Sequence, residues 1–97
     1  MMNYSIRFTD VFEKDLETKG YKLVSCEPFG KQLRSCQAWI NDGTIENIET
    51  GEIKNIKILQ SYYTLVSYIL DGVCYHCGKW SVTTSKQQSW FACGYWS

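Results

Sequence analysis

Four consecutive residues of this 97-residue chain, Cys74-Tyr75-His76-Cys77, have the types and the spacing that could do chemistry. Cysteine thiolates and histidine nitrogens are preferred zinc ligands, and a Cys-x-x-Cys pair followed by glycine resembles half of a zinc knuckle. Cys74 and Cys77 are therefore the metal-ligand candidates. The sequence offers them no second pair of this spacing, because the other three cysteines are far apart along the chain: Cys26, Cys36 and Cys93.

A nucleophilic Cys–His pair would have to use His76, the only histidine of the chain. Cys74 lies two residues away, on the same side of an extended strand. The sequence shows no acid placed to orient the imidazole and no recognisable oxyanion donor. We therefore assign no catalytic residue, no cofactor-binding residue and no cofactor, and expect a protein that is not an enzyme.

The segment Cys74-Tyr75-His76-Cys77 is predicted to lie in a β-hairpin. Asp71-Gly72 separates two predicted strands, 63–70 and 73–82, and favours a type I′ turn, which needs positive φ at both central residues. The register then pairs Leu70 with Val73, Ile69 with Cys74, Tyr68 with Tyr75, Ser67 with His76, Val66 with Cys77 and Tyr63 with Trp80. Because side chains alternate along a strand, one face should carry Val66, Tyr68, Tyr75 and Cys77 and the other Leu65, Ile69, Cys74, His76 and Trp80. Cys74 and Cys77 could bind one ion only if Gly78 marked a bulge or turn, so we predict no metal site and keep these two cysteines only as candidates.

The N-terminal half predicts one helix and several strands. Residues 10–19 form the helix, with Asp10 and Glu13 spaced as a capping box and Gly20 as its stop. Residues 21–26 and 32–40 predict strands, residues 41–43 predict a turn, and residues 44–58 predict a hairpin around Thr50-Gly51.

A short helix should close the chain, from Lys86 to about residue 93, with Ser85 and Gln88 as a capping box and Gly94 as its end. The predicted fold class is therefore α+β: a small antiparallel sheet of about four to six strands, with an N-terminal helix and a short C-terminal helix. We expect residues 1–97 to form a single domain, because the chain is short and no linker divides it.

Composition restricts the partners. Ten basic and ten acidic residues cancel, which makes nucleic acid an unlikely direct ligand. We expect no membrane partner, because no apolar run is long enough to span a bilayer and the N-terminus lacks the core of a signal peptide. The odd number of cysteines suits a reducing compartment, so we expect a cytoplasmic protein.

The C-terminal third resembles a small domain of unknown function encoded by bacteriophages and mobile elements. The resemblance rests on a pattern of Ser-Tyr-x-Thr-x-Val, a hairpin, aromatic-Ser-x-Thr-Thr and a helix, which is matched here by residues 61–66, 71–72, 80–84 and the segment that ends near Phe91. Gln87 stands where that family usually has a histidine at the helix start. The resemblance implies a bacterial host cell as the location.

It also implies a function by binding, since phage accessory proteins of this size commonly block a host protein. The leading hypothesis is a non-enzymatic phage-encoded accessory protein that binds and inhibits a bacterial host or defence protein, with an anti-CRISPR role as the concrete version. The alternative is a small nucleic-acid-binding or zinc-stabilised regulatory protein, whose Tyr and Trp residues stack on bases. Self-association also stays open, because an aromatic-rich single-layer sheet often covers its second face with another copy.

Candidate partner contacts are of two kinds. The acids of the predicted hairpin could dock on a basic surface, and a one-layer sheet cannot bury all the aromatic residues. The candidates are Glu46, Glu49, Glu52, Tyr62, Tyr63, Tyr95 and Trp96.

Overall fold

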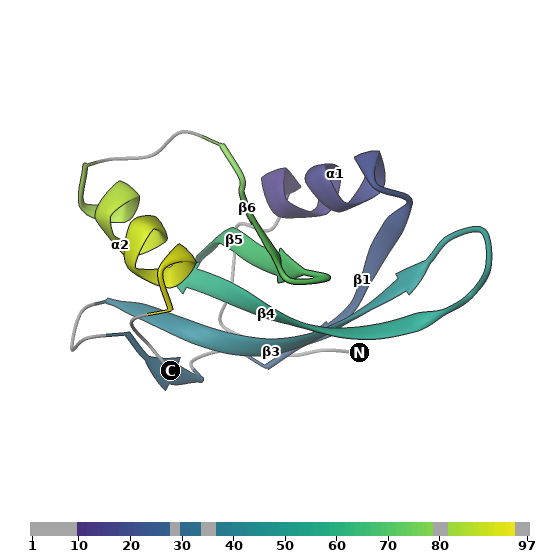
Figure 1. Cartoon of the computed structure of the whole chain (residues 1–97), viewed down its shortest axis with the longest axis horizontal. Coiled ribbons are helices and arrows are strands. Elements are labelled where there is room, and N and C mark those ends of the chain that lie inside the picture. Colours follow the sequence, from purple (N-terminus) through teal and green to yellow (C-terminus); the bar gives the residue numbers. More distant parts are fainter. Residues whose placement is uncertain (1–9, 28–29, 34–36, 79–81, 95–97) are drawn as a thin grey trace.

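A computed structural model describes residues 10–27, 30–33, 37–78 and 82–94 (Figure 1). Its elements in chain order are α1 (Asp10–Thr18), β1 (Tyr21–Cys26), β2 (Lys31–Gln32), β3 (Ala38–Asn47), β4 (Ile53–Ser61), β5 (Thr64–Leu70), β6 (Val73–His76) and α2 (Val82–Ala92). All paired strands are antiparallel, in the order β1-β3-β4-β5-β6, with β2 beside the first residues of β3. The predicted α+β fold with two helices is confirmed.

Helix α1 forms where the sequence predicts it. Phe12 and Leu16, one helical turn apart, are both fully buried. Burial of two such side chains stabilises the fold by about 1.5–3 kcal/mol each. Gly20 ends the helix with a φ of 83°, in the left-handed region that glycine adopts at little cost.

Strands β3 and β4 form the predicted hairpin, which turns at residues 48–52. The side-chain oxygen of Asn47 accepts hydrogen bonds from the backbone N–H groups of Glu49 and Thr50, and Gly51 has a φ of 77°. The two strands stay paired from Glu46 opposite Ile53 to Ala38 opposite Ser61. This long ribbon is the central part of the sheet.

The predicted turn at residues 41–43 is wrong, because these residues lie inside β3. Asn41 is fully buried there, and its side chain accepts from Gly30 N–H and donates to Gln60. Gly43 allows a close approach, since a Cβ at this position would lie 2.3 Å from Cδ1 of Ile58. The predicted strand 32–40 is also wrong in part, because β2 ends at Gln32 and β3 starts at Ala38; residues 34–36 lie outside the described part.

The β5–β6 hairpin has the predicted turn and register. Asp71 and Gly72 have φ values of 52° and 80°, as a type I′ turn requires. The predicted pairs from Leu70–Val73 to Ser67–His76 all occur, and the N–H of Cys77 continues the ladder to the carbonyl of Val66 at 2.8 Å. Strand β6 nevertheless ends at His76, and Val82, the predicted last residue of that strand, begins α2. Trp80, the predicted partner of Tyr63, lies outside the described residues.

A β-bulge changes the predicted faces of β5. Leu59 pairs with Ser67 and the next residue, Gln60, pairs with Leu65, so Val66 is the extra residue. Leu65 therefore packs with Tyr68, and Val66 packs on the opposite side. The prediction had these two residues exchanged, because strict alternation fails at a bulge.

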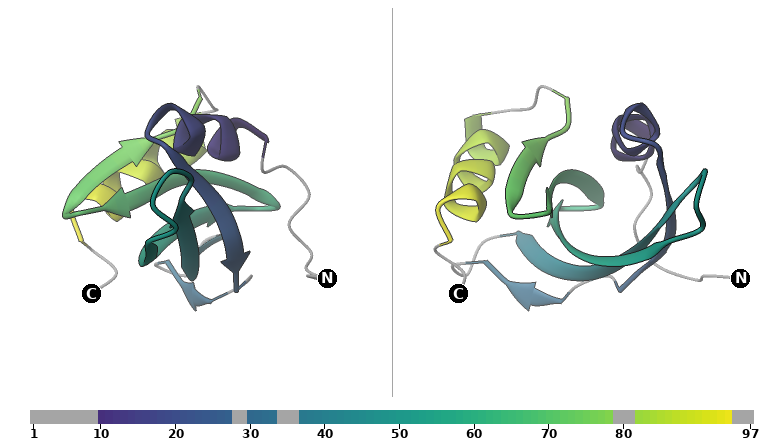
Figure 2. Two further views of the ribbon diagram at one scale, coloured as in Figure 1. Left: turned by 90° about the vertical axis from the view of Figure 1, so that its right-hand side faces the viewer. Right: turned by 45° about the vertical axis from the view of Figure 1, so that its right-hand side comes forward.

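Two hydrophobic clusters lie on opposite sides of the β5–β6 hairpin, which stands between the two helices (Figure 2). The first cluster lies under α1 and includes Phe12, Leu16 and Tyr68. The second lies under α2 and includes Leu59, Val66 and Phe91. Each helix thus covers its own part of a curved sheet.

Helix α2 starts earlier than predicted, at Val82, so Ser85 lies inside the helix. The face of α2 that meets the sheet is partly polar: Thr84, Gln87 and Gln88 are buried. The hydroxyl of Ser61 donates to Gln87 at 2.6 Å and lies 3.2 Å from the hydroxyl of Thr84. Gly94 follows the helix with a φ of 76°, as predicted.

Candidate functional site

Cys74 and Cys77 belong to different clusters. Cys74 packs against the cluster under α2, and Cys77 lies within the cluster under α1, so the predicted opposite faces are confirmed. Burial raises the pKa of Cys77 to about 12 and also raises the pKa of Cys74, which disfavours the thiolates that a metal needs. Among the described residues, no three His, Cys, Asp or Glu side chains gather as a metal site.

His76 is paired with a serine. Its Nδ1 lies 2.7 Å from the hydroxyl of Ser67, as their predicted cross-strand pairing implies. Ser67 is fully buried, whereas His76 is exposed at the edge strand. The hydroxyl therefore has no access to a substrate in this conformation, and the contact joins β6 to β5.

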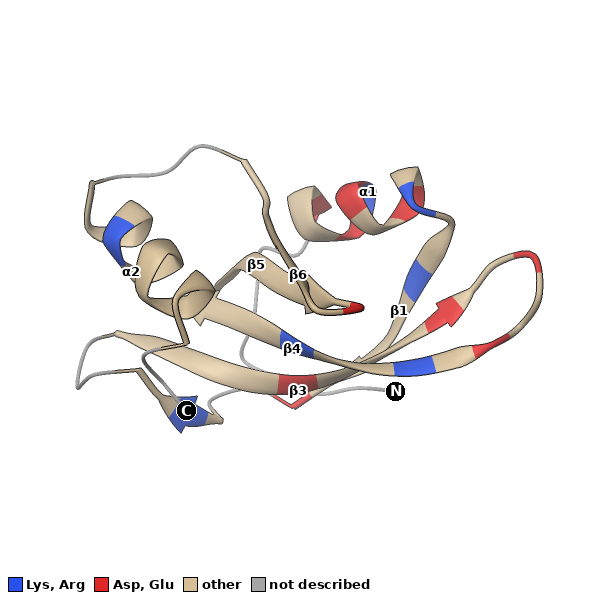
Figure 3. Ribbon diagram, viewed as in Figure 1, with Lys and Arg blue, Asp and Glu red and all other residues tan. Residues whose placement is uncertain are grey.

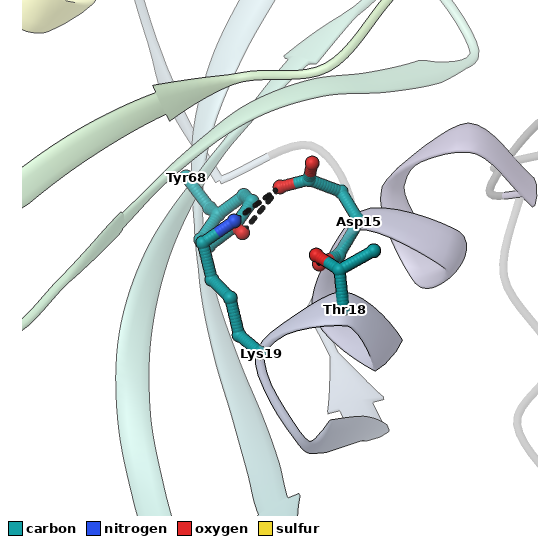
Figure 4. A network of polar contacts seen from close by, with 4 residues as sticks. All are labelled: Asp15, Thr18, Lys19 and Tyr68. Atoms are coloured by element: carbon teal, nitrogen blue, oxygen red, sulfur yellow. Dashed lines mark hydrogen bonds and ion pairs between the residues drawn. The ribbon is translucent and has the colours of Figure 1, made fainter.

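A polar network fixes α1 to the sheet (Figure 4). Tyr68 donates a hydrogen bond to Asp15, and Lys19 donates a second one at 3.0 Å. Desolvation by burial acts to raise the pKa of Asp15, but these two donors outweigh it and the pKa is lowered. Burial, followed by the bond to Asp15, raises the pKa of Tyr68. Lys19 also lies 4.2 Å from the ring centroid of Tyr75, a cation–π contact.

The partner candidates predicted from the sequence lie at two opposite ends of the β3–β4 ribbon. Glu46, Glu49 and Glu52 are at the β3–β4 turn, and Tyr62 and Tyr63 are at the β4–β5 turn. Tyr95 and Trp96 lie outside the described residues. The three acids therefore lie near one another, and so do the two tyrosines, but the acids and the tyrosines lie far apart.

The end of the ribbon with Glu46, Glu49 and Glu52, here called the acidic end, lies beside helix α1. Figure 3 shows the acids of both elements at the same end of the molecule. Glu49 and Glu52 are exposed, and Glu46 lies 3.6 Å from Lys22 of β1. Two isoleucines at this end are more than half exposed: Ile48 at 56% and Ile53 at 55%.

A groove of about 450 Å³ opens between α1, β1 and the hairpin at the acidic end. Its walls are formed by Glu13, Glu17, Lys22, Leu23 and Ile48. The hairpin acids were predicted as contacts and the α1 acids beside them were not, because only the pairing of β1 with β3 brings the two segments together.

The tyrosine end is a two-residue turn. Ser61 pairs with Thr64, which leaves Tyr62 and Tyr63 at the tip, 50% and 48% exposed. Tyr62 has a φ of 55°, a conformation that costs a non-glycine residue about 1–2 kcal/mol.

Two hydrogen bonds hold Tyr62 in this conformation. Gln60 donates its side-chain N–H to the carbonyl of Tyr62 at 2.6 Å, and the N–H of Tyr62 donates to the carbonyl of Gln37 at 2.9 Å. Gln60 is fully buried and accepts a hydrogen bond from Asn41 at 2.9 Å. This turn and its support were not predicted, because Tyr-Tyr contains none of the residues that mark turns.

No helix of the described segments has the length and apolar content needed to cross a bilayer. Residues 29–96 match the model of a family of unknown function (DUF8033). No curated protein and no solved structure matches the chain. The matched segment starts after β1 and contains the tyrosine end, the β5–β6 hairpin and α2. Because it covers more than half of the chain, this protein belongs to the DUF8033 family.

Proposed function

We propose that this protein is a non-enzymatic, phage-encoded accessory protein that binds and inhibits a bacterial host or defence protein. An anti-CRISPR protein is the most concrete form of this proposal. Its site of action would be the cytoplasm of the bacterial host. The proposal concerns binding through a surface, and the surface that supports it best is the tyrosine end.

The observation that carries the proposal is the conformation of Tyr62. Glycine would occupy this turn position at lower cost, yet the chain has a tyrosine there and supports it through Gln60 and Gln37. Such backbone strain is concentrated at functional sites in proteins. The result is a pair of adjacent, half-exposed tyrosine rings on a well-supported turn.

Two adjacent tyrosines suit a protein partner. Tyrosine is enriched among residues that dominate binding energy, because it buries a large ring and keeps a hydroxyl for a hydrogen bond. A turn held by hydrogen bonds from Gln60 and to Gln37 also loses little conformational entropy on binding. Both properties favour a binding function for this end of the molecule.

The test is a tagged chain expressed in a bacterial host that carries an active CRISPR–Cas system. We expect purification to recover one stoichiometric host protein, identified by mass spectrometry, and phage plaques to increase on that host. The Tyr62→Gly and Tyr63→Ser variants should lose both effects. Val73→Ser, at another half-exposed position at the start of β6, should retain them.

Recovery of no stoichiometric protein from hosts with defence systems of several types would reject the proposal. Loss of the partner in the Val73→Ser variant as well would show that the tyrosine end is not the specific contact.

A further inference from the structure

Strand β6 is an edge strand of the sheet. It pairs with β5 on one side, and none of the described strands pairs with its other side (Figure 1). The N–H of Cys77 donates to the carbonyl of Val66 in β5, so the backbone groups two and four residues earlier also point to β5. The N–H and C=O groups of Cys74 and His76 therefore point away from the sheet, and within the described part of the chain they have no backbone partner. Such a row of outward groups is a template for a further strand.

The other described edges of the sheet carry the features that prevent such pairing, which are charged side chains, bulges and very short strands. Strand β1 has a bulge between Leu23 and Ser25 and an exposed Lys22. Strand β2 is two residues long and begins with Lys31. Strand β6 has the sequence Val-Cys-Tyr-His, without Lys, Arg, Asp, Glu or Pro, and pairs with β5 without a register shift. Its edge is therefore open to pairing with another strand.

We propose that β6 pairs in antiparallel fashion with β6 of a second copy of this chain, so that the two sheets join into one. A two-fold axis through the contact would place the Tyr75 residues of the two copies opposite each other. Cys74 of each copy would then lie opposite His76 of the other, and each of these pairs would exchange both N–H···O bonds. The inference goes beyond the proposed function and does not depend on it.

Side chains and charges at this edge favour a second copy as the occupant. Opposed Tyr75 residues form a cross-strand aromatic pair at a non-hydrogen-bonded position, where facing side chains are closest. Lys19 lies 4.2 Å from the ring centroid of Tyr75, and its charge is matched by Asp15 at 3.0 Å. The two copies would therefore meet without unmatched like charges from this ion pair. The chain as a whole also has no net charge that would oppose association.

The test is analytical ultracentrifugation of the purified chain over a range of concentrations, with a reductant that keeps the exposed Cys93 from forming disulfides. We expect a reversible equilibrium between monomer and dimer with a dissociation constant on the order of 10–100 μM, as suits a small interface. An NMR sample that mixes isotope-labelled and unlabelled chains reports contacts between copies. It should show a contact between the Hα atoms of the two Tyr75 residues, which face each other in a non-hydrogen-bonded pair.

Matched variants at one position separate the backbone contact from the side chain. Cys74→Pro removes an outward N–H, which an edge strand tolerates, and should weaken the dimer at least about tenfold without changing the circular dichroism spectrum. Cys74→Ala keeps the N–H and should leave the dissociation constant within about twofold. His76→Lys adds a positive charge to each copy at the contact and should also weaken the dimer, which provides a second test if the proline variant does not fold.

Three results would overturn the proposal. The first is a chain that stays monomeric at all concentrations. The second is a dimer that is equally stable in Cys74→Pro and His76→Lys, or whose contacts between copies lie on another surface. The third is a monomer that loses a host protein through Cys74→Pro but not through Cys74→Ala, because this edge would then pair with a strand of a different protein.

Discussion

The hydroxyl of Tyr68 donates a hydrogen bond to the carboxylate of Asp15, 53 positions earlier in the chain. Tyr68 lies in the segment that the family model matches, and Asp15 lies before it. The ring of Tyr68 also meets Phe12 edge to face, with centroids 5.3 Å apart. These contacts join the N-terminal helix to the segment that the family model matches.

Asp15→Asn should lower the free energy of unfolding by about 1 kcal/mol at neutral pH, because charge-assisted hydrogen bonds from Tyr68 and Lys19 become neutral ones. The folded-state pKa of Asp15 is lowered, so its contribution is present above the ordinary carboxyl pKa and is lost as pH falls through the folded-state pKa. Urea unfolding should therefore show the two proteins converging below about pH 4. Asp10→Asn serves as the control, and a difference independent of pH would contradict this assignment.

Tyr62→Gly should be less destabilising than Tyr63→Gly by about 1–2 kcal/mol, although the two side chains are equally exposed. Only Tyr62 has a positive φ, so only its replacement relieves strain. Thermal unfolding of both variants measures the difference. Equal destabilisation would show that the turn stores no strain at Tyr62.

Asn41→Leu should destabilise the protein by about 2 kcal/mol, since it removes the donor to Gln60 and the acceptor for Gly30 N–H from a buried site. Combining it with Gln60→Leu should cost less than the sum of the two single changes, with a coupling of about 1 kcal/mol in a double-mutant cycle. Additive losses would mean that the two amides act independently.

Gly30→Ala should cost about 2–3 kcal/mol, because the new Cβ would lie 2.3 Å from the backbone carbonyl oxygen of Ile40, which cannot move without shifting β3. Gly43→Ala should cost less, since its closest neighbour is the end of the Ile58 side chain, which can rotate. Chemical denaturation ranks the two variants, and the reverse order would contradict the close approach at Gly30.

Cys93 should react first with a thiol reagent among the four cysteines of the described residues, since it alone is exposed. Cys26 and Cys77 should react slowest, because both are buried and burial raises the pKa of Cys26 to about 11 and that of Cys77 to about 12. Mass spectrometry after a timed reaction in native buffer gives the order. Early modification of Cys77 would mean that α1 opens readily.

Local signals predicted much of the fold. Gly20, Thr50-Gly51 and Asp71-Gly72 act through their own backbone preferences, so the helix end and both hairpins were correct. Of the candidate partner contacts on the β3–β4 hairpin, Glu49 and Glu52 are exposed, and Glu46 is half-buried beside Lys22.

The predictions that were wrong or missing concern residues whose conformation depends on contacts made only in the folded protein. Asn41 and Gly43 resemble a turn, but buried partners across the sheet hold them in a strand. The bulge at Val66 and the support of Tyr62 by Gln60 also depend on residues that meet only in the folded sheet. The α1 side of the groove was missed for the same reason.

Strand β4 carries the β3–β4 turn at its first residue and the tyrosine turn at its last. Its nine residues span about 30 Å when extended. Strand β4 is paired with β3 on one side and with β5 on the other, which makes it stiff. It therefore keeps the β3–β4 turn and the tyrosine turn at a fixed separation.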